Sequence, residues 1–449
     1  MFRIERSAVL RAVGVVTVAA ALAGGTALPA GAQPADGSPA QVCLAPGGAQ
    51  PDAAASPDAI SADGHTVVFD SAATNLVPGG GDGSNGIYAC DLHSGRVQRV
   101  DVAESGARPN GYGYGGAVSA DGRYVAFTST ADNLAPGATR GIENVFLRDL
   151  RRGRTELISV GSGTGPQVGM STWPGISADG RYVAFGSSRA DLVPGDTNNV
   201  ADIFVRDRRA GTTVRVSVHS DGTQGTVGSA FPSVSADGSR VVFVGRDRSL
   251  GDAPAAPAAP TTGAAPRLAR FYPLFSHDLR TGKTVAASVE PNGVTADVTN
   301  GTISADGRYA EFTSLDNNYR APSQVMVRDL ERGSTVLVSA APDGSEADRD
   351  ASLAGLSADD RYAFFGSAAT NMLPGGTPGA YAYYRRDLRT GRTERLFELP
   401  GEVGAATAGQ GPAVDGSGCT LVFGGDGSKL VPGDTNQNPE LFAARLHRH

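Results

Sequence analysis

The chain has 449 residues, of which 61 are glycine and 27 are proline, and 40% are hydrophobic. So much glycine and proline excludes a mainly helical protein, because both residues weaken the hydrogen-bond ladder of a helix. The apolar fraction is too high for a disordered chain. The formal charge of −7 argues against nucleic acid as a partner, since that binding depends on clustered Lys and Arg. We therefore expect an all-β protein with many short strands.

The N-terminus has the pattern of a secretory signal peptide over residues 1–32. Three arginines among the first eleven residues form a positive start, residues 12–28 are apolar, and the Ala-Gly-Ala at 30–32 fits a cleavage site. A retained membrane anchor is the alternative. We expect a secreted, extracytoplasmic chain with no membrane insertion after cleavage, and a short disordered lead-in over residues 33–40.

One motif, Ser-Ala-Asp-Gly or a close variant, recurs through the chain. Most copies are 58 residues apart, and an Ala/Pro-rich insertion at 253–266 lengthens the fourth unit. Such regularity indicates one supersecondary unit used seven times, and it overrides the several domains that the length alone would suggest. The copies start at Ser61, Ser119, Ser177, Ser235, Ser304, Ser357 and Asp415.

Each unit predicts four antiparallel strands. The apolar residue before the motif ends a first strand, and Asp-Gly forms a tight hairpin turn. A second strand carries a phenylalanine eight residues after the motif begins, a third carries an aromatic residue or Met, and a fourth follows a glycine turn. The phenylalanines are Phe69, Phe127, Phe185, Phe243, Phe312, Phe365 and Phe423. The third-strand residues are Tyr88, Phe146, Phe204, Phe275, Met326, Tyr384 and Phe442.

The two ends of the chain predict how these units close into a ring. The seventh unit stops after its third strand, and residues 41–44 offer the missing fourth strand. We predict one seven-bladed β-propeller over residues 41–446, closed by this N-terminal strand, and we expect a monomer. A six-bladed ring is the alternative if the degenerate seventh copy is not a blade.

Two phrases of the second unit carry a family resemblance. They are Ser-Ala-Asp-Gly-Arg-Tyr-Val-Ala-Phe at 119–127 and Val-Phe-Leu-Arg-Asp-Leu at 145–150. They resemble the WD40-like β-propeller repeat of TolB-type proteins, over nearly all of residues 41–446. The resemblance implies a secreted or periplasmic bacterial propeller that acts as a binding or scaffolding module. No α/β domain precedes the blades as it does in TolB proteins, so we do not expect a role in a Tol-type envelope complex.

The sequence presents no recognisable catalytic motif. The Asp of the turn and the Arg-Asp pair that ends the third strand occur in most units, which favours a role in the fold over a role in one active site. No Gly-x-Ser-x-Gly elbow is present, and the six histidines form no zinc motif. We assign no catalytic residue and expect no obligatory cofactor.

Two loops suggest calcium as an alternative. Asp196, Asn198 and Asp202 alternate in the third unit, and Asp434 and Asn436 repeat the pattern in the seventh. Carboxylate and amide oxygens suit Ca²⁺, but the spacing is not that of an EF-hand. Loops stabilised by Asp and Asn bonding their own backbone are the favoured interpretation, and a calcium-stabilised binding module stays open.

Three cysteines remain, and export permits a disulfide. Cys90 ends the third strand of the first blade, and Cys419 lies in the first turn of the seventh. Both positions fall on the same face of neighbouring blades, so we predict a Cys90–Cys419 bridge across the closure of the ring. Pairing of Cys43 with either of them, or three free thiols, are the alternatives.

Four aromatic residues are candidate ligand contacts, namely Tyr112, Tyr114, Trp173 and Phe231. Loops on a rigid scaffold are the usual place for binding, although packing between blades is the alternative role of the last two.

The favoured function is a secreted, non-catalytic scaffold that binds an unknown protein, peptide or carbohydrate over its loop face. The alternative is an extracellular propeller hydrolase or lyase acting on a polysaccharide or peptide. Three or more unpaired acidic or His side chains at one channel mouth would favour the enzyme. A mouth of Gly, Ala and turn residues would favour binding.

Overall fold

The computed structural model describes residues 38–162, 168–251, 272–315, 321–375, 377, 379–399, 412–427, 430, 434, 436 and 438–446. The predicted signal peptide, most of the lead-in and the 253–266 insertion lie outside these residues. Across the described ranges, no helix is long and apolar enough to cross a membrane.

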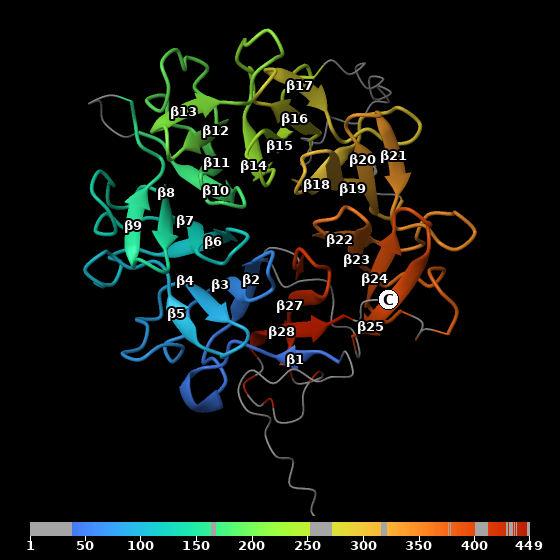
Figure 1. Cartoon of the computed structure of the whole chain (residues 1–449), viewed down its shortest axis with the longest axis horizontal. Helices are drawn as coiled ribbons and strands as arrows, with labels where there is room; N and C mark the ends of the chain where they lie inside the picture. The colour runs from blue at the N-terminus through green and yellow to red at the C-terminus, as the bar shows by residue number, and fades with distance from the viewer. Residues whose placement is uncertain are drawn as a thin grey trace, which may run out of the picture.

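Seven four-stranded antiparallel sheets form a ring (Figure 1), so the seven-bladed propeller is confirmed. Blades 1 to 3 contain β2 (Ala55–Ile60), β3 (Thr66–Ser71), β4 (Gly86–Asp91), β5 (Val97–Arg99), β6 (Gly113–Val118), β7 (Tyr124–Ser129), β8 (Asn144–Asp149), β9 (Arg154–Leu157), β10 (Ser171–Ile176), β11 (Tyr182–Ser187), β12 (Asp202–Asp207) and β13 (Thr212–Arg215). Blades 4 to 6 contain β14 (Ser229–Val234), β15 (Arg240–Gly245), β16 (Leu274–Asp278), β17 (Lys283–Ala286), β18 (Asp297–Ile303), β19 (Tyr309–Leu315), β20 (Gln324–Asp329), β21 (Ser334–Leu337), β22 (Ala351–Leu356), β23 (Tyr362–Ser367), β24 (Ala382–Asp387) and β25 (Thr393–Glu398). Blade 7 contains β26 (Ala413–Val414), β27 (Thr420–Asp426), β28 (Pro439–Arg445) and β1 (Ala40–Gln41), which is followed by a 3₁₀ turn, η1 (Pro46–Gly48).

The N-terminal strand closes the ring, as predicted. Ala40 lies opposite Ala443 and Gln41 opposite Phe442, so β1 is the outer strand of blade 7. The paired segment is shorter and begins one residue earlier than the predicted 41–44. Closure in this way gives the last blade the same four strands as the others and pairs the outer edge of β28.

The predicted phenylalanines and their third-strand partners form the core of the blades. Phe127 on β7 lies directly opposite Phe146 on β8, and both are fully buried. Six blades hold an aromatic pair of this kind, with ring centroids 5.2–6.1 Å apart, and in blade 5 Met326 faces Phe312. Each aromatic pair adds about 0.5–1.5 kcal/mol beyond the burial of its area.

The Ser-Ala-Asp-Gly turns tie neighbouring blades together at six of the seven seams. Within a turn, the Ser119 hydroxyl donates to Asp121 Oδ1 at 2.9 Å and accepts from the Tyr124 N–H at 2.9 Å. Between turns, the Ala120 N–H donates to the Ala178 carbonyl at 3.0 Å. A Cβ on Gly238 would overlap the Tyr182 ring of the preceding blade, so the glycine permits this close approach.

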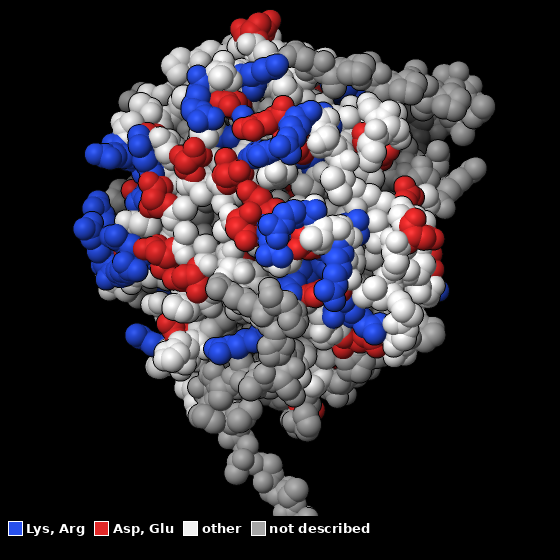
Figure 2. Space-filling view, turned by 45° about the vertical axis from the view of Figure 1, so that its right-hand side comes forward, with Lys and Arg blue, Asp and Glu red and all other residues white. Residues whose placement is uncertain are grey.

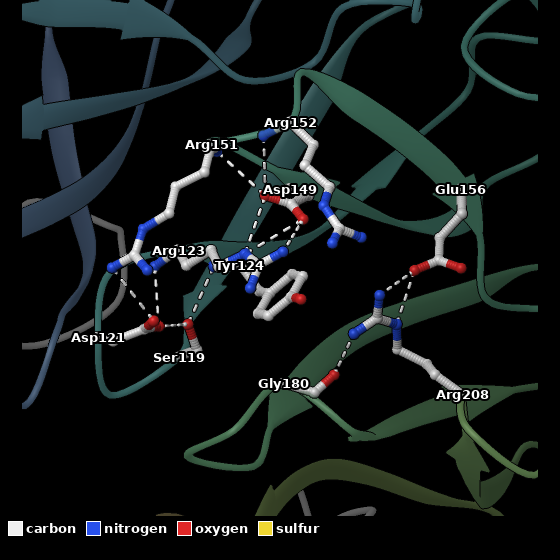
Figure 3. Close-up of polar contacts among 10 residues, drawn as sticks. All are labelled: Ser119, Asp121, Arg123, Tyr124, Asp149, Arg151, Arg152, Glu156, Gly180 and Arg208. Carbon is white, nitrogen blue, oxygen red and sulfur yellow. Dashed lines mark hydrogen bonds and ion pairs between the residues drawn. The ribbon is translucent and has the colours of Figure 1, made fainter.

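A second network repeats toward the end of the third strand (Figure 3). The Arg123 guanidinium pairs with Asp149 at 2.6 Å and stacks on the Tyr124 ring, 4.5 Å from its centroid. Asp149 also accepts the N–H groups of the following turn, from Arg151 and Arg152. The equivalent pairs are Arg181–Asp207, Arg308–Asp329 and Arg361–Asp387, and in blade 4 Arg240, one position later in its unit, pairs with Asp278. Repetition in five blades indicates a structural network.

The disulfide joins Cys43 to Cys90, with 5.6 Å between the Cα atoms, and the predicted Cys90–Cys419 bridge is wrong. The chain leaves β1 on the outside of blade 7 and passes directly over blade 1, which brings Cys43 into the same apolar cluster as Cys90 and Leu92. Cys419 lies in the turn between β26 and β27, at the inner end of its blade. The bridge therefore fastens the closing segment to the first blade.

We expect the Cys43→Ser/Cys90→Ser double variant to lower the free energy of unfolding by about 2–4 kcal/mol, because the bond ties the closing strand across 47 residues of chain. Urea unfolding followed by circular dichroism measures this loss. The matched control is Cys419→Ser, which should change stability by less than about 0.5 kcal/mol. Equal stability of the double variant and the wild type would contradict a role for the bond in closure.

Candidate functional site

The innermost strands of blades 3 and 4 each contain a β-bulge occupied by an aromatic residue. The pairing register shifts between Thr172 and Gly175 in blade 3 and between Ala230 and Ser233 in blade 4. Trp173 at φ 52° and Phe231 at φ 54° lie within these bulges. Left-handed backbone is costly for large side chains and persists only where the surroundings enforce it.

Blade 2 shows what the bulge requires of the backbone. Gly115 occupies the same position as Trp173 and has φ 66°. Glycine adopts this conformation without strain, so the aromatic residues in the next two blades are kept at a conformational cost. A bulge re-aims a side chain relative to its strand, and here both side chains line the central channel.

The channel contains a cavity of about 500 Å³ at its centre. The Trp173 and Phe231 rings lie against each other in its wall, with centroids 4.6 Å apart, and Phe231 keeps 44% of its surface exposed. The remaining described lining is mostly Gly, Ala, Pro and aliphatic residues of the inner strands and turns, with Ser233, Asn300, Thr302 and Ser304 as neutral polar residues.

Asp58 supplies the single carboxyl group among the described residues that line this cavity, and none of them is a histidine. Its Oδ2 atom is buried without a hydrogen-bond partner, 3.1 Å from where a Cβ on Gly116 would stand. Burial raises the pKa of Asp58 well above its usual range, and repulsion from Asp70 adds to this. Among the described lining residues, Asp58 has no second carboxyl group with which to share acid–base work.

The two candidate tyrosines form a separate pair. The rings of Tyr112 and Tyr114 stack with centroids 6.2 Å apart, and the Tyr112 hydroxyl donates to Glu143 at 3.4 Å. Tyr112 is 46% exposed. Neither tyrosine lines the cavity, so the structure brings Trp173 and Phe231 together and leaves the tyrosines in a different place.

In blade 3, the residues suggested for calcium surround an arginine. Arg215 on β13 pairs with Asp196 at 3.0 Å and with Asp202 at 3.5 Å. Asn198 donates to Asp202 at 2.8 Å and to the Gly225 carbonyl at 2.9 Å. The guanidinium thus occupies the position between the two carboxylates that a bound cation would take.

In blade 7, the equivalent loop contacts the neutral residue Gln41 in place of an arginine. Gln41 lies opposite Phe442 as Arg215 lies opposite Phe204, and it donates to Glu440. Burial raises the pKa of Glu440 to about 7, since its bonds to Asn436 and Gln41 offset only part of the desolvation. Asp434 accepts from Gln50 and from the Asn436 N–H through Oδ1. Across the described residues, no group of three or more His, Cys, Asp or Glu side chains is arranged to hold a metal ion, and calcium here stays a prediction.

Charged side chains do not gather into one patch on the face shown in Figure 2, where Asp and Glu alternate with Lys and Arg. The repeated Arg–Asp pairs likewise bring both signs together. Such a surface gives little long-range attraction to a strongly charged polymer.

Searches against protein-family models and against curated proteins give no match. Solved structures do resemble this chain. An oligogalacturonate lyase in complex with manganese is 14% identical over 89% of this chain and 92% of its own, with a TM-score of 0.54. Oligogalacturonate lyase from Vibrio parahaemolyticus is 13% identical over 88% and 91%, with a TM-score of 0.52. TolB from Acinetobacter baumannii is 16% identical over 63% and 53%, with a TM-score of 0.38. At this identity, the two lyases support the propeller fold and leave the activity open.

Sequence reasoning missed Asp58, although a signal was present. Asp58 stands three residues before the first Ser-Ala-Asp-Gly motif, where the other units have Gly116, Pro174, Pro232, Gly301, Ala354 and Pro412. A single departure from a repeat marks a residue that the fold does not require.

We expect Arg215→Gln, which copies the blade 7 arrangement into blade 3, to lower the free energy of unfolding by about 3 kcal/mol, because Asp196 and Asp202 would lose their cation. Urea unfolding with and without millimolar Ca²⁺ measures the effect. Arg209→Gln, at an exposed position, is the control and should be neutral. Unchanged stability of Arg215→Gln would contradict the assignment of this ion pair as structural.

Proposed function

We propose that this chain is an exported, non-catalytic binding propeller whose ligand enters the central channel and contacts Trp173 and Phe231. The observation that carries the proposal is the pair of strained aromatic bulges that line one cavity. The bulge itself does not require this strain, since Gly115 builds the same bulge without it. Strained residues of this kind concentrate where a ligand is held.

The composition of the cavity supports binding over catalysis. Its described lining is dominated by Gly, Ala and turn residues, with one carboxyl group, Asp58. Hydrolysis or elimination on a polysaccharide or peptide needs a base and an acid placed around one bond. The channel instead offers an aromatic surface and neutral hydrogen-bonding groups, which suit the ring face of a sugar or an apolar peptide side chain.

This proposal moves the contact from the outer loops to the channel. The loop-face pair, Tyr112 and Tyr114, remains a second surface for a partner. Export is part of the proposal because the signal-like segment at 1–32 and the disulfide between Cys43 and Cys90 suit an oxidising compartment. Two of the similar structures are oligogalacturonate lyases, so polysaccharides are the first class of ligand to test for binding to this chain.

The test uses the mature chain, residues 33–449, as bait for material in culture supernatant, followed by mass spectrometry. The variant is Trp173→Gly/Phe231→Gly, because glycine fits the backbone of both bulges. Relief of the left-handed strain opposes the loss of the ring contact, so stability should stay within about 1 kcal/mol of the wild type. Recovery of the captured ligand should fall at least tenfold. The matched control, Tyr112→Ala, should bind as the wild type does.

Three results would oppose the proposal. Equal recovery by the double variant would remove the channel as the site. Loss of recovery with Tyr112→Ala alone would return the site to the loop face. A captured polymer that is shortened by the wild type would replace binding with catalysis.

A further inference from the structure

The seam between blades 5 and 6 differs from every other seam of the ring. Each remaining pair of neighbouring Ser-Ala-Asp-Gly turns is joined by a backbone hydrogen bond of 2.7–3.2 Å. These bonds run from Asp63 to Ala120, Ala120 to Ala178, Ala178 to Ala236, Ala236 to Ala305, Ala358 to Gly416 and Gly416 to Ala62. Ala305 and Ala358, both described, have no such bond between them. The ring of turns is thus open at one place.

The glycine of the motif is also replaced at this seam. Six turns have glycine at the fourth position, each with φ between 67° and 77°, and the turn of blade 6 has Asp360 with φ 55°. One carboxyl oxygen of Asp360 is buried without a hydrogen-bond partner. Its carboxyl group faces Asp306 of the blade 5 turn, with Asp359 of its own turn and Arg308 of blade 5 as the other charged neighbours.

A second carboxyl group lies deeper in the same seam. Glu311 on β19 is 0% exposed, and neither of its carboxyl oxygens has a hydrogen-bond partner. It lies opposite Val327, which packs against blade 6 in one apolar cluster with Ala363 and Phe365. The other units have Val68, Ala126, Ala184, Val242, Phe364 and Val422 at this position.

A buried carboxylate without a partner is much more costly than a buried neutral carboxylic acid. Burial is the whole cause of the raised pKa of Glu311, which is about 8, and no charged group of the described residues shifts it further. Burial and the Asp306 carboxyl group raise the pKa of Asp360 to about 7, against a smaller opposing effect of Arg308. Both carboxyl groups therefore enter the closed seam in the protonated form.

We propose that the seam between blades 5 and 6 is a pH-sensitive weak point of the ring, which is held closed by protonated Glu311 and Asp360 and opens more often as the medium becomes alkaline. The unfolded pKa values are near 4 and the folded values are higher, so the closed form binds more protons than the open form. Its stability is full in acid and is lost as the pH rises from about 4.5 to 8. Above pH 8 the dependence levels off.

Hydrogen exchange with mass spectrometry on the mature chain tests this proposal. Peptides that cover β19 and β22 report on the seam between blades 5 and 6. Peptides that cover β11 and β14 report on the seam between blades 3 and 4, which is the internal reference. After correction for intrinsic rates, protection at β19 and β22 should fall at least tenfold between pH 5.5 and pH 8. For each carboxyl group, every pH unit between its open-state and folded pKa raises the ratio of open to closed form about tenfold. Protection at the reference seam should fall by much less.

The variant for this test is Glu311→Val/Asp360→Gly, which installs the residues of blades 1, 4 and 7 and of the other turns. In this variant, protection at β19 and β22 should fall less than threefold between pH 5.5 and pH 8. Glu311→Gln/Asp360→Asn removes the charges with little change of shape and should behave alike. Glu440→Gln removes a buried carboxyl group in blade 7 and should leave the fall unchanged. The proposal would be overturned if protection fell equally at both seams of the wild type. It would also be overturned if protection at β19 and β22 fell as much in both double variants as in the wild type.

Discussion

The backbone hydrogen bonds between neighbouring Ser-Ala-Asp-Gly turns are the constraint on which the rest of the structure depends. Each bond holds the inner end of one blade against the next at six of the seven seams, so the inner strands are gathered around one central channel. The motif supplies what this spacing needs, namely a hydroxyl and a carboxyl group that fix the turn and a glycine that admits the neighbouring ring. A channel held in this way can keep aromatic residues in a conformation that a free strand would not retain.

Closure of the ring uses a different set of forces. β1 adds its backbone to blade 7, and the Cys43–Cys90 bond holds the segment that follows against blade 1. The same strand brings Gln41 to the place that Arg215 has in blade 3. A residue almost four hundred positions away in the chain therefore helps to set the charge balance of blade 7. Gln41 is neutral where Arg215 carries a positive charge, and burial raises the pKa of Glu440 to about 7.

The repeat allowed most of the fold to be predicted from sequence, including the strands that carry Phe127 and Phe146 and the strand that closes the ring. The site was less accessible, for a physical reason. The bulges change which way Trp173 and Phe231 face, and a bulge in an inner strand leaves no mark in a pattern of alternating residues. The disulfide depended on the path between two blades, which spacing does not specify. Departures from the repeat, such as Asp58, Glu311 and Asp360, are the signals that sequence alone can still provide.

The central claim is that the channel is where this protein meets its ligand, and Trp173 makes it directly measurable because it is the chain's one tryptophan. Acrylamide quenching of its fluorescence reports access to the cavity wall. The account predicts that a saturating amount of the captured ligand reduces the quenching constant at least threefold. A ligand that binds by calorimetry and leaves the quenching constant of Trp173 unchanged would contradict it.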